Sequence, residues 1–386
     1  MNNTPIYLDN AAATRLDERV LEAMTPFLFE TYTVATSQFS YSLGIAAREA
    51  LERARSDIAA SLGAASEEII FTSGSTESSN MAIKGVPHAL ANKGKHIVTT
   101  RLEDFPVLNS VKALERDGYT VTWLDTDSDG RLDPAALEGA IRPDTVLVSI
   151  QAANQEIGTL QDLAALAAIC KARGVVLHSD ATHTYPRLPL DVSSLSVDLL
   201  TLSTELVHGP KGVGALYLRK GTPLHKWMDG GFQEFNLRAG SENIAGAVGM
   251  ARAVELVTPE ETAGIQAMRD AALEQLLAIP QSILNGHATW RTPQNVNVSF
   301  RFVEGEAITL HMDLRGYALS TGSACFSRAL EASHVILGIG GDHERAHGSV
   351  RLTFGRYNTL DDATGAANAL AEVIERLRAI SPLGKD

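Results

Sequence analysis

The segment VVLHSDATHTYPRLPLDVSSLSVDLLTLS, residues 175–203, contains the pattern that decides the fold. Its two apolar runs, Val175 to Ser179 and Asp198 to Ser203, have the length and composition of buried strands. Five similar runs occupy the first two thirds of the chain: Ile69 to Ser73, His96 to Thr100, Thr120 to Leu124, Thr145 to Ile150 and Val213 to Leu218. Helical patterns lie between them, so we expect an α/β protein with a mostly parallel seven-stranded sheet.

The spacing of apolar residues along the sequence changes after about residue 258. Before that point, helical segments such as residues 51–62 have apolar residues at the three-and-four spacing of helices that lie half-buried on a sheet. Beyond it, alternating strands and a long terminal helix predict a smaller α+β unit. We expect a large domain over residues 16–258, a small domain formed by residues 1–15 and 259–386, and a cleft between them.

The composition narrows the class of partner. Lysine and arginine minus aspartate and glutamate give 33 − 46 = −13, which argues against nucleic acid or an anionic membrane surface. The two cysteines, Cys170 and Cys325, are too few for a disulfide framework. The polar start of the chain lacks the apolar core of a signal peptide, and no apolar run approaches the length of a membrane span. A cytoplasmic protein with reduced thiols is the expectation.

Polar residues follow the predicted strands on the edge where α/β proteins bind ligands. Gly74, Ser75 and Thr76 lie between a strand and a helix, and free N–H groups there suit a phosphate. Taken alone, these residues favour a simple helix cap over a ligand site. Asp180 ends another strand and suits a protonated ring nitrogen, and Ser203 ends the next one.

Two further residue types suggest chemistry. Cys325 lies in STGSACFS, residues 320–327, among small residues, where a thiolate can act as a nucleophile. Cys170 lies on an apolar helical pattern and is interpreted as core. Arg351 lies in a strand-like alternation, and its guanidinium has the shape for holding a carboxylate.

One motif is rejected. HERAH, residues 343–347, matches the HExxH zinc pattern, but Gly348 and a strand-like run follow at once. Too little helix remains to bring both imidazoles to one metal ion, so no metal site is predicted there.

Several stretches together resemble the NifS and IscS cysteine desulfurases, which belong to the class V aminotransferases within fold type I pyridoxal phosphate enzymes. The resemblance runs from about Tyr7 to about Pro382 and is carried by YLDNAAAT from Tyr7, FTSGSTESSNMAIKG from Phe71, VSIQAANQEIG from Val148, HSDATH from His178, HGPKGVGALY from His208, RAGSEN from Arg238, STGSACFS from Ser320 and VRLTFGRYNT from Val350.

The resemblance implies a role for each matched residue. Thr76 and Ser203 would hold the cofactor phosphate, with Ser241 reaching across from the partner subunit of a homodimer. Asp180 would face the pyridine nitrogen. Arg351 would take the substrate carboxylate, and Cys325 would accept the sulfane sulfur as a persulfide.

The departures from the family pattern cluster around the cofactor ring. The Ser-Gly-His-Lys segment of the family appears here as residues 203–206, so Leu206 replaces the lysine that would bind the cofactor covalently. The ring-stacking histidine is matched by Asp104, the ring-contacting asparagine by Gln155, and a glutamine near the ring oxygen by His183. Because the lysine also moves protons in these enzymes, the usual reaction is not expected here.

Three functions remain open at this stage. The first is a sulfur-transfer or iron-sulfur assembly protein in which Cys325 carries a persulfide or ligates a cluster at the interface with a scaffold protein. The second is an active desulfurase or lyase that uses noncovalently bound pyridoxal phosphate. The third is a non-catalytic module whose pocket lacks that cofactor and binds another phosphorylated or carboxylated ligand.

Overall fold

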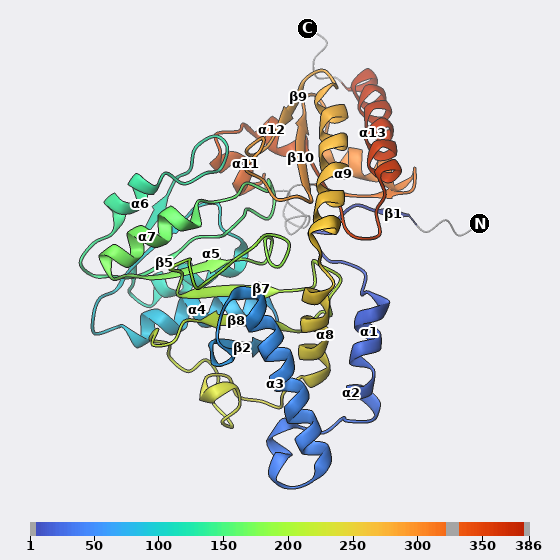
Figure 1. The fold of residues 1–386 in the computed structure, drawn as a ribbon. Helices are drawn as coiled ribbons and strands as arrows, with labels where there is room; N and C mark the ends of the chain where they lie inside the picture. The colour runs from blue at the N-terminus through green and yellow to red at the C-terminus, as the bar shows by residue number, and fades with distance from the viewer. Residues whose placement is uncertain (1–4, 322–331, 382–386) are drawn as a thin grey trace.

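The computed structural model describes residues 5–321 and 332–381 and is built around a seven-stranded sheet (Figure 1). The strand order is β2-β8-β7-β6-β5-β3-β4, with parallel pairing from β7 through β4 and antiparallel pairing of β8 with both neighbours. The strands are β2 (Ile69–Thr72), β3 (His96–Thr100), β4 (Thr120–Leu124), β5 (Thr145–Ser149), β6 (Val176–Asp180), β7 (Leu199–Ser203) and β8 (Gly214–Leu218). The predicted mostly parallel seven-stranded sheet is confirmed.

Helices cover both faces of this sheet. The helices of this part of the chain are α1 (Glu18–Met24), α2 (Pro26–Phe29), α3 (Ser42–Leu62), α4 (Ser75–Ala89), α5 (Phe105–Arg116), α6 (Pro134–Ala140), α7 (Leu163–Arg173) and α8 (Ile244–Glu255), with short 3-10 turns η1 (Ala35–Phe39) and η2 (Ser66–Glu68). Helices α3, α6, α7 and α8 share one core cluster with the sheet, and α4 and α5 share another. Successive strand residues point to opposite faces, so Phe71 joins the first cluster and Ile70 the second.

A second region of the structure is built around a four-stranded antiparallel sheet ordered β12-β13-β10-β9. Its strands are β9 (Ser282–Leu284), β10 (Asn295–Phe300), β12 (Ser320–Thr321) and β13 (Ser349–Thr353). The surrounding helices are α9 (Pro259–Leu277), α10 (Gly305–Asp313), α11 (His334–Gly338), α12 (His343–His347) and α13 (Leu360–Ile380). This region has its own core, in which Val298, Leu352 and Leu370 are fully buried.

The beginning of the chain folds onto this second region. Strand β1 (Ile6–Tyr7) pairs in parallel with β11 (Tyr317–Ala318), and Asp9 forms a bridge to Thr353. Asn10 Nδ2 donates to the Thr353 carbonyl oxygen at 2.7 Å. The first residues therefore pack against strands that follow them by more than 300 positions. The predicted boundaries, 16–258 against 1–15 with 259–386, stay a prediction.

A buried ion pair fixes the loop between β8 and α8. The guanidinium of Arg55 on α3 donates to both carboxylate oxygens of Glu234 at 2.7 and 2.8 Å, and Phe71 N donates to the same carboxylate at 2.7 Å. Glu234, Phe235 and Asn236 form the short turn η3, and all three have positive φ (44°, 56° and 64°). Left-handed backbone costs about 1–2 kcal/mol for each such residue, so the ion pair holds a strained turn in place.

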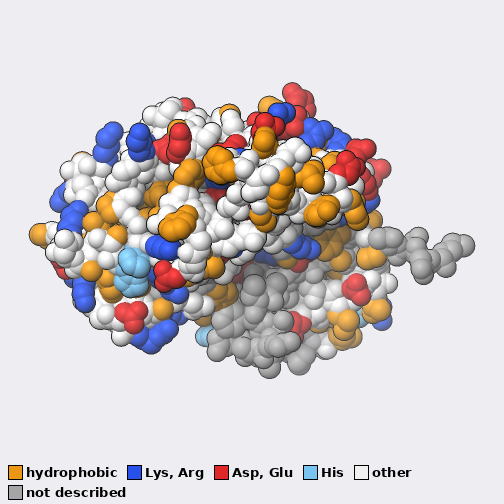
Figure 2. All heavy atoms as spheres, turned by 90° about the horizontal axis from the view of Figure 1, so that it is seen from below, with side chains coloured by type: hydrophobic (Ala, Val, Ile, Leu, Met, Phe, Trp, Pro, Cys, Tyr) orange, Lys and Arg blue, Asp and Glu red, His pale blue; other side chains and the backbone are white. Residues whose placement is uncertain are grey.

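Exposed hydrophobic side chains gather where α2, η1 and the start of α3 lie, the end of the molecule seen in Figure 2. The exposed side chains of this segment are Leu28, Phe29, Tyr32, Phe39, Tyr41, Leu43 and Ile45. Phe39 is 91% exposed and Phe29 74%. A monomer rarely leaves so many apolar side chains of one segment in water. Within the described ranges, no helix combines the length and apolar character needed to cross a membrane.

Candidate functional site

A cavity of about 350 Å³ lies at the carboxyl ends of the central strands. This volume is within the range of small-molecule sites. Three site residues predicted from the strand pattern and residue chemistry, and four that follow from the family pattern, line it together: Ser75, Thr76 and Arg351, and Asp104, Gln155, His183 and Leu206. The remaining lining residues are Ala11, Ala12, Phe105, Pro106, Glu156, Thr182, Glu205 and His334. Segments far apart in sequence therefore meet at the sheet edge that the strand pattern indicated.

One end of the cavity suits an anion. Helix α4, 15 residues long, begins at Ser75, so its first N–H groups and the positive end of its dipole are directed there. Gly74 has φ 148°, and a Cβ atom built on it would have no heavy atom within 4 Å. Ser203 pairs with Gly214 across β7 and β8, and a Cβ on Gly214 would approach Gly74 Cα to 2.7 Å. Ser203 thus lies close to the start of α4, and its buried hydroxyl has no hydrogen-bond partner among the described residues.

Asp180 lies at the end of β6 and is buried. Its Oδ1 accepts a hydrogen bond from Thr182 N at 3.0 Å, and burial raises the pKa of the carboxyl to about 6. A buried polar chain runs beside it: His178 bonds Ser149 Oγ at 2.8 Å and Thr201 Oγ1 at 3.0 Å, and Thr201 Oγ1 bonds Ser79 Oγ at 3.0 Å. These buried hydrogen bonds join β5, β6, β7 and α4 and hold the end of β6, which carries Asp180.

Carboxyl groups from three separate segments line the cavity. Asp104 caps α5 and accepts from Phe105 N at 2.8 Å, Glu156 lies in the loop after β5, and Glu205 precedes Leu206. Burial raises the pKa of all three, that of Glu156 to about 7. The two histidines of the lining, His183 and His334, have pKa values lowered by burial, to about 3 for His183.

Arg351 extends from β13 to the cavity wall. Its guanidinium donates to Asp9 Oδ1 at 2.9 Å and to the Gln155 carbonyl oxygen at 3.0 Å, and its Nε has no partner among the described residues. The side chain is 7% exposed. A guanidinium has five N–H groups, and one held in this way can still donate to a carboxylate.

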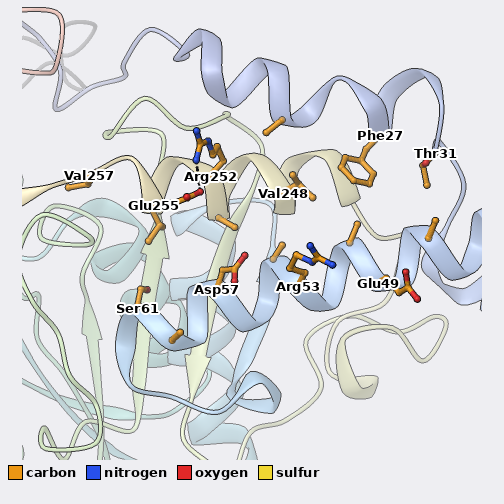
Figure 3. A pocket seen from close by; sticks show the side chains of 17 residues that line it. Phe27, Thr31, Glu49, Arg53, Asp57, Ser61, Val248, Arg252, Glu255 and Val257 are labelled. Atoms are coloured by element: carbon orange, nitrogen blue, oxygen red, sulfur yellow. Dashed lines mark hydrogen bonds and ion pairs between the residues drawn. The ribbon is translucent and has the colours of Figure 1, made fainter.

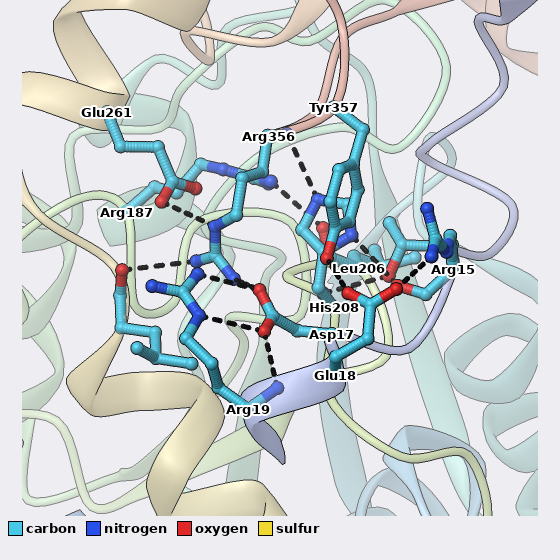
Figure 4. Close-up of polar contacts among 12 residues, drawn as sticks. Arg15, Asp17, Glu18, Arg19, Arg187, Leu206, His208, Glu261, Arg356 and Tyr357 are labelled. Atoms are coloured by element: carbon cyan, nitrogen blue, oxygen red, sulfur yellow. Dashed lines mark hydrogen bonds and ion pairs between the residues drawn. The ribbon is translucent and has the colours of Figure 1, made fainter. Parts of the chain in front are cut away.

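The turn that carries Leu206 is held by side-chain hydrogen bonds to its backbone carbonyl oxygens (Figure 4). Arg187 Nη2 donates to the Leu206 carbonyl oxygen at 3.0 Å, and Thr14 Oγ1 donates to that of Glu205 at 2.6 Å. His208 donates from Nδ1 to the Arg15 carbonyl oxygen at 2.9 Å, so its Nε2 is the acceptor for Arg356 N at 3.0 Å. Position 206 is therefore fixed in place while its side chain carries no amine.

The ion pairs below this turn join several elements (Figure 4). Arg356 binds Asp17 at 2.6 Å and Glu261 at 2.8 Å, and Asp17 also binds Arg19 at 2.8 Å. These hydrogen bonds, with that from Arg19 first, hold the pKa of Asp17 well below its usual range. The network links α1, α9 and the segment after β13.

Some predicted site residues do not line the cavity. Ser241 is exposed in the loop before α8, Gly74 is partly buried, and Asp180 and Ser203 are buried. Cys325 lies outside the described residues. Cys170 is buried on α7, as interpreted, and burial raises the pKa of its thiol to about 12. Sequence reasoning missed Glu156, Thr182 and His334 as lining residues.

A larger groove of about 1010 Å³ lies elsewhere, between α3, α8 and the α1–α2 segment (Figure 3). Alanine, valine and phenylalanine side chains form much of its wall, and charged residues such as Arg53, Asp57 and Glu255 flank it. None of the predicted site residues lines it. The smaller cavity is thus the candidate active site.

Comparison with known proteins agrees with this geometry. The model of the family described as aminotransferase class-V matches residues 6–364. The chain belongs to this family. Cysteine desulfurase IscS of Dictyoglomus turgidum is 47% identical over 381 residues, 98% of this chain and 96% of that protein. IscS of Methanosarcina thermophila is 44% identical, covering 99% and 95%. Among solved structures, a NifS-like protein has 33% identity and a TM-score of 0.90, covering 96% of this chain and 100% of that one.

Membership of this family implies pyridoxal phosphate, and the residues fit only one part of it. The start of α4, where Ser75 and Thr76 line the cavity, fits the phosphate. The covalent link does not fit, because Leu206 is 5% exposed on the cavity wall and its side chain carries no amine. We therefore derive no reaction step through this cofactor.

Proposed function

We propose that this protein is a divergent relative of the cysteine desulfurases that carries sulfur on Cys325 for an acceptor or scaffold protein of iron-sulfur assembly. The proposal is carried by Leu206, which lines the cavity on a turn fixed by Thr14 and Arg187 and occupies the position that the resemblance assigns to the family's lysine. The class of the curated relatives, named cysteine desulfurase IscS, supports the sulfur-transfer role.

The sulfur step needs no cofactor. The Cys325 thiolate would attack the outer sulfur of a donor persulfide, and the donor's S–S bond would break as its thiolate leaves. Transfer to the acceptor is the same exchange with Cys325 as the donor. An acceptor thiolate would attack the outer sulfur on Cys325, and the Cys325 thiolate would leave. The sulfur moves as a neutral atom, the electron pair of the attacking thiolate forms the new S–S bond, and the donor thiolate leaves with the pair of the old bond, so no external oxidant or reductant is required.

The proposed assembly is a homodimer. The exposed apolar side chains of α2, η1 and α3 supply a surface that association would bury, and Ser241 is exposed, as a residue that reaches a partner's site must be. Light scattering of the purified protein should give twice the mass of the chain. A monomer at micromolar concentration would contradict this assembly.

The decisive experiment loads sulfur from a persulfide donor and locates it by mass spectrometry. We expect sulfur on Cys325, none on Cys170, and no loading of a Cys325→Ser variant. With cysteine and added pyridoxal phosphate, we expect no sulfide above the protein-free control. Sulfide release by the unmodified protein would overturn the proposal in favour of a working desulfurase.

Position 206 can be tested separately. Leu206→Lys places an amine on the fixed turn, and we expect it to give a visible absorption band with pyridoxal phosphate, whereas the unmodified protein and Leu206→Met give none. A band in Leu206→Met would show that another amine binds the cofactor.

A further inference from the structure

Helix α12 carries two histidines one turn apart. His343 and His347 are its first and last residues, so they occupy positions i and i+4, whose Cβ atoms lie about 5–6 Å apart on a helix surface. Their rings stack, with centroids 6.4 Å apart and an angle of 24° between the planes. The sequence pattern predicts too little helix to bring both imidazoles together. The structure differs, because positions i and i+4 need only a single turn.

Both imidazoles are available to a ligand. The two side chains are exposed, and neither forms a hydrogen bond to any residue that the structure describes. Rotation of the rings toward a shared ion therefore breaks no hydrogen bond within that part of the chain. A neutral imidazole is the commonest metal ligand in proteins.

The three residues between the histidines hold the turn against the protein. Glu344 forms an ion pair with Arg301, and Arg345 Nε donates to Asn285 Oδ1 at 2.8 Å. Ala346 is buried in a hydrophobic cluster that α12 shares with α11. The turn is thus fixed before an ion arrives, which lowers the entropic cost of binding through two ligands at once.

Glu344 also decides the kind of site. In HExxH zinc proteases this glutamate is the general base. Here its carboxylate accepts from Phe302 N at 3.0 Å and from Arg301, so it is already occupied. Among the residues that the structure describes, no group of three or more His, Cys, Asp or Glu could hold a metal ion. The pair therefore supplies two nitrogen ligands and leaves the other positions of an ion to water.

We propose that His343 and His347 form a surface site for one divalent transition-metal ion, which both imidazoles bind together. Imidazole suits copper, nickel and zinc, whereas Mg²⁺ prefers oxygen ligands. Affinity for nitrogen ligands rises from Ni²⁺ to Cu²⁺ and falls again to Zn²⁺, so Cu²⁺ should bind most tightly. The ion joins both ends of α12 and should stabilise the folded chain, because the unfolded chain does not hold the two rings together.

Calorimetric titration of the untagged, full-length Cys325→Ser variant with CuCl₂, NiCl₂, ZnCl₂ and MgCl₂ tests the site. The serine removes a thiol that would bind the same ions, so the result is independent of the sulfur-transfer proposal. We expect one Cu²⁺ per chain, weaker binding of Ni²⁺ and Zn²⁺, and no binding of Mg²⁺. His343→Gln and His347→Gln should each weaken Cu²⁺ binding at least about tenfold.

Two control variants locate the ion. His311→Gln changes a partly exposed histidine of α10 that has no histidine four residues away, and it should leave binding unchanged. His88 and His225 form another pair, with ring centroids 6.1 Å apart and an angle of 79° between the planes. His225→Gln should also leave Cu²⁺ binding unchanged. Loss of binding in either control, with the α12 variants unaffected, would overturn the proposal.

The double variant of His343→Gln with His347→Gln distinguishes one shared ion from two separate ones. If both rings bind one ion, each single variant already loses the site, and the double variant should bind within about twofold of either. Cu²⁺ should raise the unfolding temperature of the parent protein and of neither single variant, while all three should unfold at the same temperature without metal. Two ions per chain, additive losses, or binding that depends on neither histidine would overturn the proposal.

Discussion

Glu234→Gln should destabilise the large sheet region far more than its small change in size suggests. The substitution removes the charge that balances Arg55, which is 2% exposed and keeps its bonds to the Ile69 carbonyl oxygen and two aromatic neighbours, Phe71 and Phe235. Of the three hydrogen bonds that the carboxylate accepts, at 2.7, 2.7 and 2.8 Å, a single amide oxygen can retain two at most. Removing one partner of a buried pair costs about 3–5 kcal/mol, and we expect about 3 kcal/mol here because the amide keeps part of the bonding.

The assay is urea denaturation of the single variants and of the double variant Arg55→Gln with Glu234→Gln. The free energy of unfolding of the double variant should fall by at least about 2 kcal/mol less than the sum of the losses of the two single variants. Each single variant leaves one buried charge without its partner, whereas the double variant leaves no such charge. Arg142→Gln is the matched control, because its ion pair with Asp144 is nearly half exposed on both sides and should contribute about 0–1 kcal/mol. A loss under about 1 kcal/mol for Glu234→Gln, or additive losses, would refute the reasoning.

Three further outcomes follow from the structure. Burial raises the pKa of Glu103 from its ordinary 4.5 to about 8, so between these pH values the folded protein keeps a proton that the unfolded chain has released. The free energy of unfolding therefore falls as the pH rises from about 5 to about 8. Glu103→Gln should reduce this fall, measured as urea midpoints across the same pH range. Gly214→Ala should cost roughly 1–3 kcal/mol in urea denaturation by overpacking, because its Cβ would meet Gly74 Cα at 2.7 Å, whereas Gly139→Ala on α6, whose Cβ would have no heavy atom within 4 Å, should not destabilise the protein. Cys170 is buried with a raised thiol pKa, so Cys170→Ala should leave labelling of the native protein by a thiol reagent unchanged, and a halved signal would contradict this.

The strands were predictable because each forms a short apolar run between helices, and the structure places all seven within one residue of the predicted limits. The site edge followed from the same pattern, since parallel strands end on one side. Cavity residues such as His334 could not be found this way, because α11 reaches the site only through tertiary packing. The Arg55–Glu234 pair joins residues 179 apart, and no local pattern marks such a partner.

The pairing of β1 with β11 has a consequence for synthesis of the chain. Ile6 and Tyr7 are synthesised some 300 residues before their partners in the sheet, Tyr317 and Ala318. The seven-stranded sheet is complete by residue 218 and can fold as soon as its last strand emerges. Ile6 and Tyr7 therefore stay unpaired after the large sheet has folded. In a nascent chain halted near residue 250, the segment around them should be cleaved by proteases until translation resumes.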